Sequence, residues 1–348
     1  MQQRLEKQIF IQFDRELYKE QIANSIPSII KKGKKILKSY IYFNLFFTSL
    51  LCLEIIYFFI HITLLVQTFV IAIHLSLIFA TLFSFLTLRL YAQSRKTEQL
   101  LALISDFLHN CERLPRKGEE SDLHLFISDA CCKLATEIHG CEYFVFGRPF
   151  WCIFLHSSLE KINCYLFWRD IHFIKETLLE TSVEKHIQVV RMKPTDLEAH
   201  AGLGNAYVML SGIYVDPASM DGLEDGKWIP SNKFGESFKQ KFRLCAKKAI
   251  EEFKILSHYA PNDPWVHAQL AYSYRDLQMP AEEMKEYETI LTLCPEDKES
   301  LFQLGKLYFA QGKNGKGLQI YETLTSSNYK KAEQLIRFYD GGKVLEEV

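Results

Sequence analysis

The feature that most constrains this chain is an apolar stretch over residues 41–88, in which Glu54 is the only formally charged side chain. A bilayer core of roughly 30 Å takes about 20 helical residues, so the stretch is long enough for two spans. Backbone polar groups inside a bilayer must bond within their own segment, which favours helices. The sequence therefore predicts a membrane region over 40–90, with two transmembrane helices near 41–61 and 66–88.

Basic residues flank this stretch on both sides. Cytoplasmic flanks of membrane proteins carry an excess of Lys and Arg, so we expect both termini in the cytosol. A cleaved signal peptide would place its apolar core closer to the N-terminus, behind fewer charged residues. We therefore expect an integral protein, most simply of the bacterial inner membrane, with the lipid bilayer as a partner. The flanking basic residues are Lys31, Lys32, Lys34, Lys35 and Lys38 before the stretch, and Arg89, Arg95 and Lys96 after it.

Glu54 admits two interpretations. A charge inside a bilayer costs at least about 2.5 kcal/mol unless it is paired or protonated, so such a carboxylate can mark a functional site. The alternative is a neutral acid that bonds Thr63, Thr68 or a second copy of the hairpin. The second interpretation is favoured because neither span supplies a basic partner.

The residues around the hairpin predict further helices. Residues 1–39 form a head in which apolar side chains recur about every four positions, as in an amphipathic helix that could lie on the membrane or pack on the C-terminal region. We expect 91–120 to be a linker, with 89–113 extending the second span and a break at Leu114–Gly118. Residues 121–196 predict a helical block, capped at Ser121–Asp122, which could include a degenerate repeat over 163–196. Leu5, Ile9, Phe13 and Leu17 form the apolar stripe of the head.

The C-terminal half contains an internal repeat of 34 residues. Pro261 and Pro295 are separated by that distance, and residues 264–297 align with 298–331. In this register Leu270, Ala271 and Tyr274 match Leu304, Gly305 and Tyr308, Tyr287 matches Tyr321, and Leu203, Gly204 and Tyr207 fit the same pattern upstream. A fixed period of this length is typical of helical solenoids.

These residues resemble the tetratricopeptide repeat (TPR) family, whose unit carries Leu-Gly-x-x-Tyr in its first helix and a closing proline. The resemblance implies three repeats over 197–331, with an insertion at about 211–240 because the second helix of the first repeat is 33 residues late. It also implies a capping helix and tail over 332–348. We thus predict an all-α fold, a transmembrane helical hairpin followed by a TPR solenoid, in which the matched residues form the core.

By the same resemblance, certain positions of each first helix line a groove that holds a protein or peptide. Aromatic side chains beside Arg and Lys are the composition of binding hot spots. The alternative is that Trp265 caps a neighbouring helix and Phe309 belongs to the core between repeats. TPRs that hold the C-terminal carboxylate of heat-shock chaperones use a set of Lys, Asn and Arg of which only Asn205 is present. The predicted groove residues are Asn205, Trp265, Tyr272, Arg275, Phe302, Lys306 and Phe309.

Motifs for catalysis and cofactors were not found. The sequence has no phosphate-binding, nucleophile-elbow or metalloprotease signature, so we expect no enzyme and no cofactor. Nine cysteines occur, but none is spaced as in a zinc site, which predicts free thiols in the 109–172 block and no metal. The acidic residues of the 211–240 insertion lack the spacing of a calcium loop. A net charge of −1 argues against nucleic acid as a partner.

The function that fits these features is a membrane-anchored TPR adaptor that mediates protein–protein interaction on the cytosolic face. The alternative is a secreted effector, because the closely spaced double span resembles the bilobed hydrophobic segment of chlamydial inclusion-membrane proteins. Such an effector would bind a host protein.

Overall fold

The computed structural model describes residues 2–64, 68–113, 120–146, 156–215, 229 and 234–342, and all regular secondary structure in these ranges is helical. This confirms the predicted all-α class. The chain divides into a hairpin unit, residues 1–182 with 222–233, and a repeat unit, residues 183–221 with 234–348.

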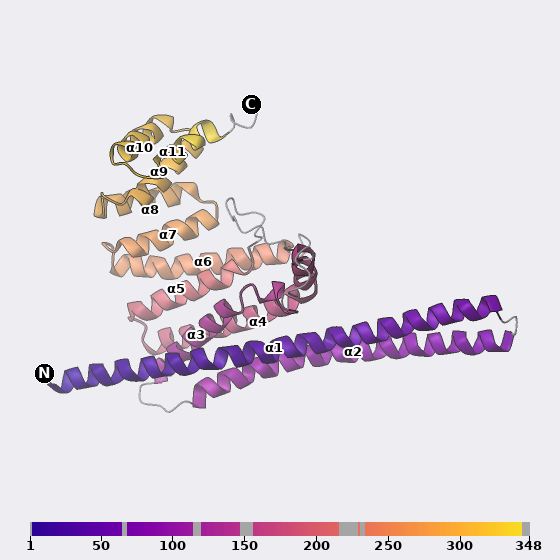
Figure 1. Ribbon diagram of the computed structural model, residues 1–348. Coiled ribbons are helices and arrows are strands. Elements are labelled where there is room, and N and C mark those ends of the chain that lie inside the picture. The colour runs from indigo at the N-terminus through magenta and orange to yellow at the C-terminus, as the bar shows by residue number, and fades with distance from the viewer. Residues whose placement is uncertain are drawn as a thin grey trace. The chain divides into compact units, whose positions relative to one another are not determined.

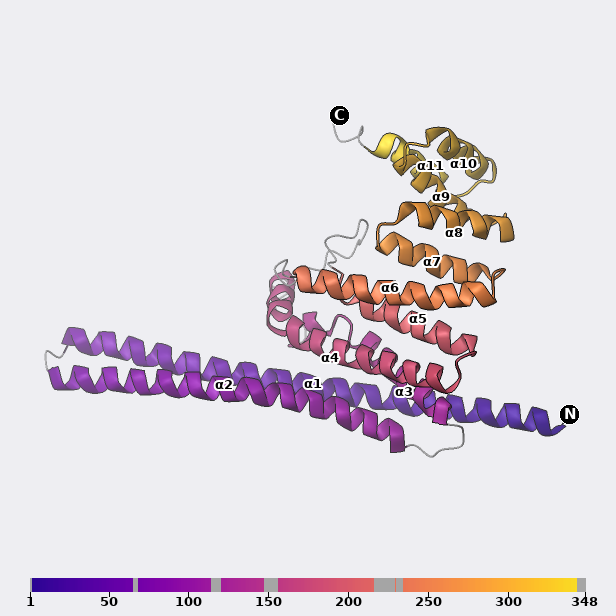
Figure 2. The ribbon, with the colours of Figure 1, turned by 180° about the vertical axis from the view of Figure 1, so that it is seen from behind.

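Two long antiparallel helices, α1 (Gln2–Leu64) and α2 (Thr68–Arg113), carry the apolar stretch. They lie side by side along their length (Figures 1 and 2). Both helices are long and apolar enough to cross a membrane, by length and composition. Between residues 41 and 90, most of the large apolar side chains that the structure describes face outward, so packing between the two helices does not account for their composition.

Contacts between α1 and α2 fix their register. Tyr40 donates a hydrogen bond to Gln99 (3.2 Å), and Thr81 donates one to Oε1 of Glu54 (2.9 Å). Glu54 therefore has a threonine partner, Thr81, while the side chains of the predicted partners Thr63 and Thr68 lie outside the described part of the chain. Antiparallel pairing sets residue 54 opposite 81, whereas 63 and 68 are closer to the turn in sequence.

The structure changes the predicted boundaries of the N-terminal half. The head is continuous with the first span, because α1 starts at Gln2. Residues 91–113 are part of α2 and not a linker, since the polar extension simply continues the helix. The expected break at Leu114–Gly118 lies outside the described residues.

The helical block contains α3 (Glu120–Glu137), the short 3₁₀ helix η1 (Cys141–Tyr143) and α4 (His156–Met192). Gly140 has φ of +79°, which glycine adopts without strain, and this is where the α3 segment turns. Because α4 is one uninterrupted helix, residues 163–196 are not a helix–turn–helix repeat, and that part of the prediction is wrong. The missing Leu-Gly at Arg169–Asp170 already pointed to this result.

The repeat unit stacks helices in chain order (Figure 1). Each helix of the third pair starts 34 residues after the corresponding helix of the second pair, as the sequence predicts. The 211–240 insertion joins the first pair, with residues 216–228 and 230–233 outside the described ranges. The helices are α5 (Leu197–Gly212) and α6 (Glu236–Tyr259), α7 (Pro264–Asp276) and α8 (Pro280–Leu293), and α9 (Lys298–Ala310) and α10 (Asn314–Ser326).

Each first helix begins at an aspartate N-cap. The side chains of Asp196, Asp263 and Asp297 accept hydrogen bonds from backbone N–H groups in the first turn of α5, α7 and α9. Such caps stabilise a helix by about 1 kcal/mol. The turns after α7 and α9 also repeat, since Gln278 and Gly312 both have positive φ. The 34-residue period thus extends from the core to the caps and turns.

The core of the repeat unit contains the residues that define the repeat. Leu270, Tyr274, Tyr287, Leu304 and Tyr308 are buried. A Cβ atom at Gly204 would come within 2.7 Å of the Phe253 ring, so the backbone of α5 approaches α6 closely there. The array is closed by α11 (Ala332–Leu335) and the 3₁₀ helix η5 (Ile336–Gly342), whose Ala332 and Leu335 enter the apolar cluster of the last pairs.

Candidate functional site

The first helices of the first two pairs, α5 and α7, expose part of the predicted groove. Asn205 on α5 and Tyr272 on α7 are exposed, Tyr272 by 46%. Trp265 is 41% exposed, and its ring also packs edge-on against Phe253 of α6, with centroids 6.1 Å apart. Trp265 therefore both covers the neighbouring helix and presents an aromatic surface to solvent.

Arg275 is held in place by the second helix of its own pair. Its Nε donates to Glu283 (2.8 Å) and its Nη2 donates to the Tyr287 hydroxyl, while the guanidinium lies 5.5 Å from the centre of the Tyr272 ring. Glu283 is buried, and the ion pair with Arg275 compensates the desolvation cost of its carboxylate. Arg275 is thus a preorganised cation beside an exposed aromatic ring.

A chain of polar contacts continues onto the third pair. Arg275 Nη2 reaches Gln303 (3.5 Å), and Gln303 donates to Oε1 of Glu299 (2.8 Å). Oε2 of Glu299 accepts from Tyr329 (2.5 Å) and Lys331 (2.8 Å). Partial burial would raise the pKa of Glu299, but these hydrogen bonds outweigh it and lower the pKa to about 2. Glu299 is therefore neutralised by its neighbours and does not present an unpaired negative charge.

Two predicted groove residues do not lie on an open surface. Phe302 and Phe309 are buried in the apolar cluster formed by α8, α9, α10 and α11. Their prediction as exposed groove residues is wrong, because α11 packs across the third pair and the ring of Phe309 fills the space over Gly317. Lys306 is partly buried, with its ammonium 4.6 Å from the centre of the Phe338 ring. The exposed part of the surface is therefore concentrated on α5 and α7.

A histidine–glutamate pair recurs in the first two helix pairs. Nδ1 of His200 lies 2.6 Å from Glu252, and Nε2 lies 3.0 Å from the carbonyl oxygen of Pro194. His267 makes the same two contacts with Glu286 (2.6 Å) and Pro261 (2.9 Å). Because a carbonyl oxygen only accepts, Nε2 must donate in both cases.

These pairs connect the start of each first helix to its second helix. Burial alone would lower the pKa of His200, but the hydrogen bonds to Glu252 and Pro194 outweigh it and raise the pKa above its usual range. In the third pair the equivalent positions are Leu301 and Ile320, which pack in the apolar cluster. The shared spacing Pro-x-Asp-x-x-x-His at 194–200 and 261–267 is the signal that would have revealed the pairs.

The cysteine-rich block shows structural contacts rather than a reactive site. Cys132 lies 3.1 Å from the Ser182 hydroxyl, and burial raises the pKa of its thiol. Burial also raises the pKa of Cys141. Thiols of raised pKa are poor nucleophiles and metal ligands. No group of three or more His, Cys, Asp or Glu residues that could hold a metal ion occurs within the described part of the chain.

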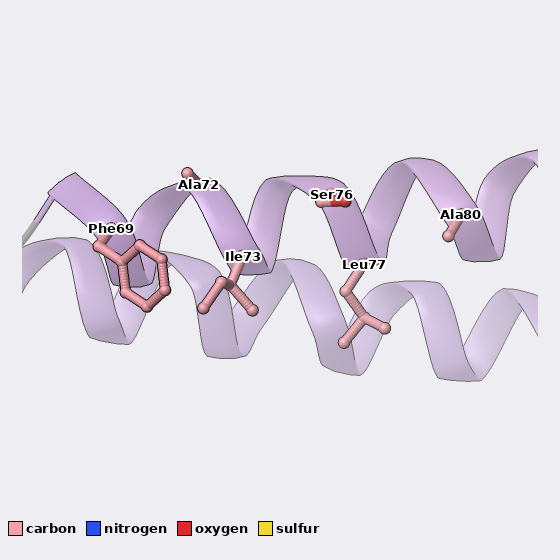
Figure 3. A pocket seen from close by; sticks show the side chains of 6 residues that line it. All are labelled: Phe69, Ala72, Ile73, Ser76, Leu77 and Ala80. Atoms are coloured by element: carbon pink, nitrogen blue, oxygen red, sulfur yellow. The ribbon is translucent and has the colours of Figure 1, made fainter.

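A hollow of about 460 Å³ lies along one face of α2 (Figure 3). Three small side chains, Ala72, Ser76 and Ala80, alternate there with larger apolar ones. Among the described residues that line it, Ser76 is the only polar one, so the hollow lacks the converging polar groups of a ligand site. The remaining lining residues are Phe69, Ile73 and Leu77.

Comparison with known proteins adds little. No known protein family and no curated protein matches the chain. Among solved structures, a thermophilic TPR protein from Thermus thermophilus aligns with 63% of this chain and all of its own, with 14% identity and a TM-score of 0.32. A likeness of that size carries no argument about fold details or function, so the case rests on the residues themselves.

Proposed function

We propose that this chain is a membrane-anchored scaffold, whose hairpin spans a bilayer and whose repeat unit binds another protein. The hairpin supports the anchor, because α1 and α2 present large apolar side chains outward along most of the predicted spans. Soluble proteins rarely expose contiguous apolar surfaces of this extent. The bilayer is the environment in which such a surface is stable.

The observation that carries the binding proposal is the pairing of Tyr272 with Arg275. The ring is exposed, while the guanidinium beside it is fixed by Glu283 and Tyr287. Rigid aromatic and arginine side chains lose little conformational entropy on binding and dominate protein interfaces. We propose that Asn205, Trp265, Tyr272 and Arg275, with Lys306 at the margin, contact the partner.

A crosslinking pull-down from intact membranes tests this proposal. The full chain is compared with a Tyr272→Ala, Asn205→Ala variant, which removes exposed side chains and leaves the Arg275–Glu283 pair intact. Truncation of a hot-spot residue costs about 2 kcal/mol or more of binding free energy, so a specific partner should be lost. The matched control is Tyr259→Ala, because Tyr259 is also an exposed tyrosine but lies at the end of a second helix.

The same partners captured by both variants and the native chain would contradict the proposed surface. In that case the 211–240 insertion becomes the next segment to test.

The proposed topology places both termini in the cytosol, on the side of the basic flanks. Reporter fusions at each end of the full chain test it: both should report the cytosolic side, and opposite results would contradict the hairpin. Localisation of the tagged chain separates an inner-membrane adaptor from a secreted effector, which would be found in a membrane of another cell.

A further inference from the structure

Helix α4 has a second apolar face, whose large side chains are exposed. Asn163, Cys164, Phe167, Trp168 and Ile171 are buried on one side of the helix. On the opposite side Ile162, Tyr165, Leu166 and Arg169 follow the spacing i, i+3, i+4, i+7 of a single helix face, and all four are exposed. The side chain of Tyr165 is the most exposed of the three large apolar ones, at 63%. An amphipathic helix of a soluble domain needs only the first of these faces.

Side-chain contacts place this part of α4 beside the start of the apolar stretch. Phe146 packs against Phe167 of α4 (centroids 5.5 Å apart) and also against Tyr42 of α1 (6.1 Å). Its ring lies 5.8 Å from the ammonium of Lys38. Asp170 forms an ion pair with Lys96 of α2 (2.9 Å). Asp170 is therefore level with the basic flanks of the hairpin.

The direction of α4 follows from a second set of contacts. Lys175, further along α4, pairs with Glu142 (3.7 Å), and the neighbouring Cys141 lies within electrostatic reach of Lys34. Increasing residue numbers on α4 thus correspond to decreasing numbers on α1. The start of α4 is therefore the end of this helix nearer the apolar stretch. With a rise of about 1.5 Å per residue, Ile162 lies about 12 Å from Asp170 along the helix, so the exposed face is close to the basic flanks of the hairpin.

The charges around the exposed face suit a lipid surface. Lys161 and Arg169 are exposed at its two ends, and long basic side chains can extend to the headgroups while their stems stay in apolar surroundings. Of the acidic side chains next to this face, Asp170 is already paired with Lys96 and Glu160 is half-buried. Tyrosine is enriched at the boundary between headgroups and acyl chains.

We infer that the face of α4 formed by Ile162, Tyr165, Leu166 and Arg169 inserts into the boundary of the same bilayer that the hairpin spans. This inference rests on the proposed membrane anchor, and the contacts of Phe146 and Asp170 hold this part of α4 next to the basic flanks of α1 and α2. The hairpin unit is then attached to the membrane by two spans and by an interfacial helix. Interfacial helices bind through their buried apolar area and through attraction to anionic lipids.

Photocrosslinking of the full chain in vesicles of phosphatidylcholine and phosphatidylglycerol tests the inference. The photoreactive residue p-benzoylphenylalanine replaces Tyr57, Tyr165 or Tyr259 in three separate variants. Tyr57 reports on the hairpin, and Tyr259 is a matched control in the repeat unit because its exposed fraction of 62% equals that of Tyr165 within 1%. After irradiation, lipid adducts are detected as added mass on the peptide that carries the probe. We expect adducts at 57 and 165 and none at 259.

An adduct at 57 without one at 165 would overturn the inference while leaving the anchor intact. No adduct at either position would contradict the membrane anchor itself. An adduct at 259 as strong as at 165 would show non-specific labelling and also overturn the inference. A second variant, Ile162→Asn with Leu166→Asn, should lower the yield at 165 severalfold and leave the yield at 57 unchanged. Both substitutions are on the exposed face and leave the packed face of α4 intact.

Discussion

In the hairpin, α1 and α2 turn large apolar side chains outward, and Phe83 is 73% exposed, whereas in the repeat unit the side chain of Phe309 is 1% exposed. Both segments are helical and both contain phenylalanine. The difference lies in what packs against the apolar surface. In the repeat unit the next helix pair covers it, and in the hairpin we propose that lipid does. The same residue type therefore has opposite consequences for folding in the two regions.

The largest expected difference between the two regions is the change in stability when one phenylalanine is truncated in each. Phe309→Ala removes a ring from the closed core of the last repeats, so we expect the free energy of unfolding of the repeat unit to fall by about 3–5 kcal/mol. Phe83→Ala removes a ring that touches little protein, so we expect no change. Chemical denaturation of the full chain in detergent, followed by circular dichroism, measures both. Equal losses would contradict the comparison.

A smaller effect is expected where helices of the repeat unit meet most closely. A Cβ at Gly317 would lie 2.5 Å from the Phe309 ring, whereas a Cβ at Gly315 meets nothing within 4 Å. We expect Gly317→Ala to destabilise by about 1–3 kcal/mol through overpacking. Gly315→Ala, on the same helix, should leave the thermal midpoint unchanged or slightly raised. A similar response from both variants would show that close packing at this point has little importance.

The smallest effect concerns polar contacts between helices. The pKa of His200 is raised in the folded state, so the stabilisation is complete below the ordinary pKa and is lost as the pH rises through the raised value. The denaturant concentration at the midpoint of unfolding should therefore decrease as the pH rises above about 6.5, the ordinary pKa of histidine. The double substitution His200→Leu, Glu252→Ile copies Leu301 and Ile320 of the third pair. It should fold and reduce this dependence, and an unchanged pH profile would contradict the role of the pair.

The sequence predicted the fold well where the physics is local or periodic. The apolar stretch predicted two long helices, and the 34-residue period predicted the helix pairs of the repeat unit, together with the buried Leu270, Tyr274 and Tyr308. Helix boundaries were less predictable, because α2 continues through polar residues as far as Arg113. Helix propensity and neighbouring contacts decide such ends, and hydropathy alone does not.

The candidate surface was predicted only in part. The resemblance to TPR proteins selected Tyr272 and Arg275, which are exposed, but it did not predict the burial of Phe302 and Phe309, which depends on how α11 packs. The partner of Glu54 could not be read from one span, because it depends on the register between α1 and α2. The exposed face of α4 could not be predicted either, because the sequence does not show which side of this apolar helix packs against the fold. Tertiary contacts decide all three cases.

The measurement that tests the central claim most directly is alkaline carbonate extraction of membranes from cells that express the full chain. A hairpin that spans the bilayer keeps the chain in the membrane pellet, because lipid covers the outward apolar side chains of α1 and α2. We predict that the chain stays in the pellet and is released only by detergent. Release into the supernatant as a soluble protein would contradict the membrane anchor.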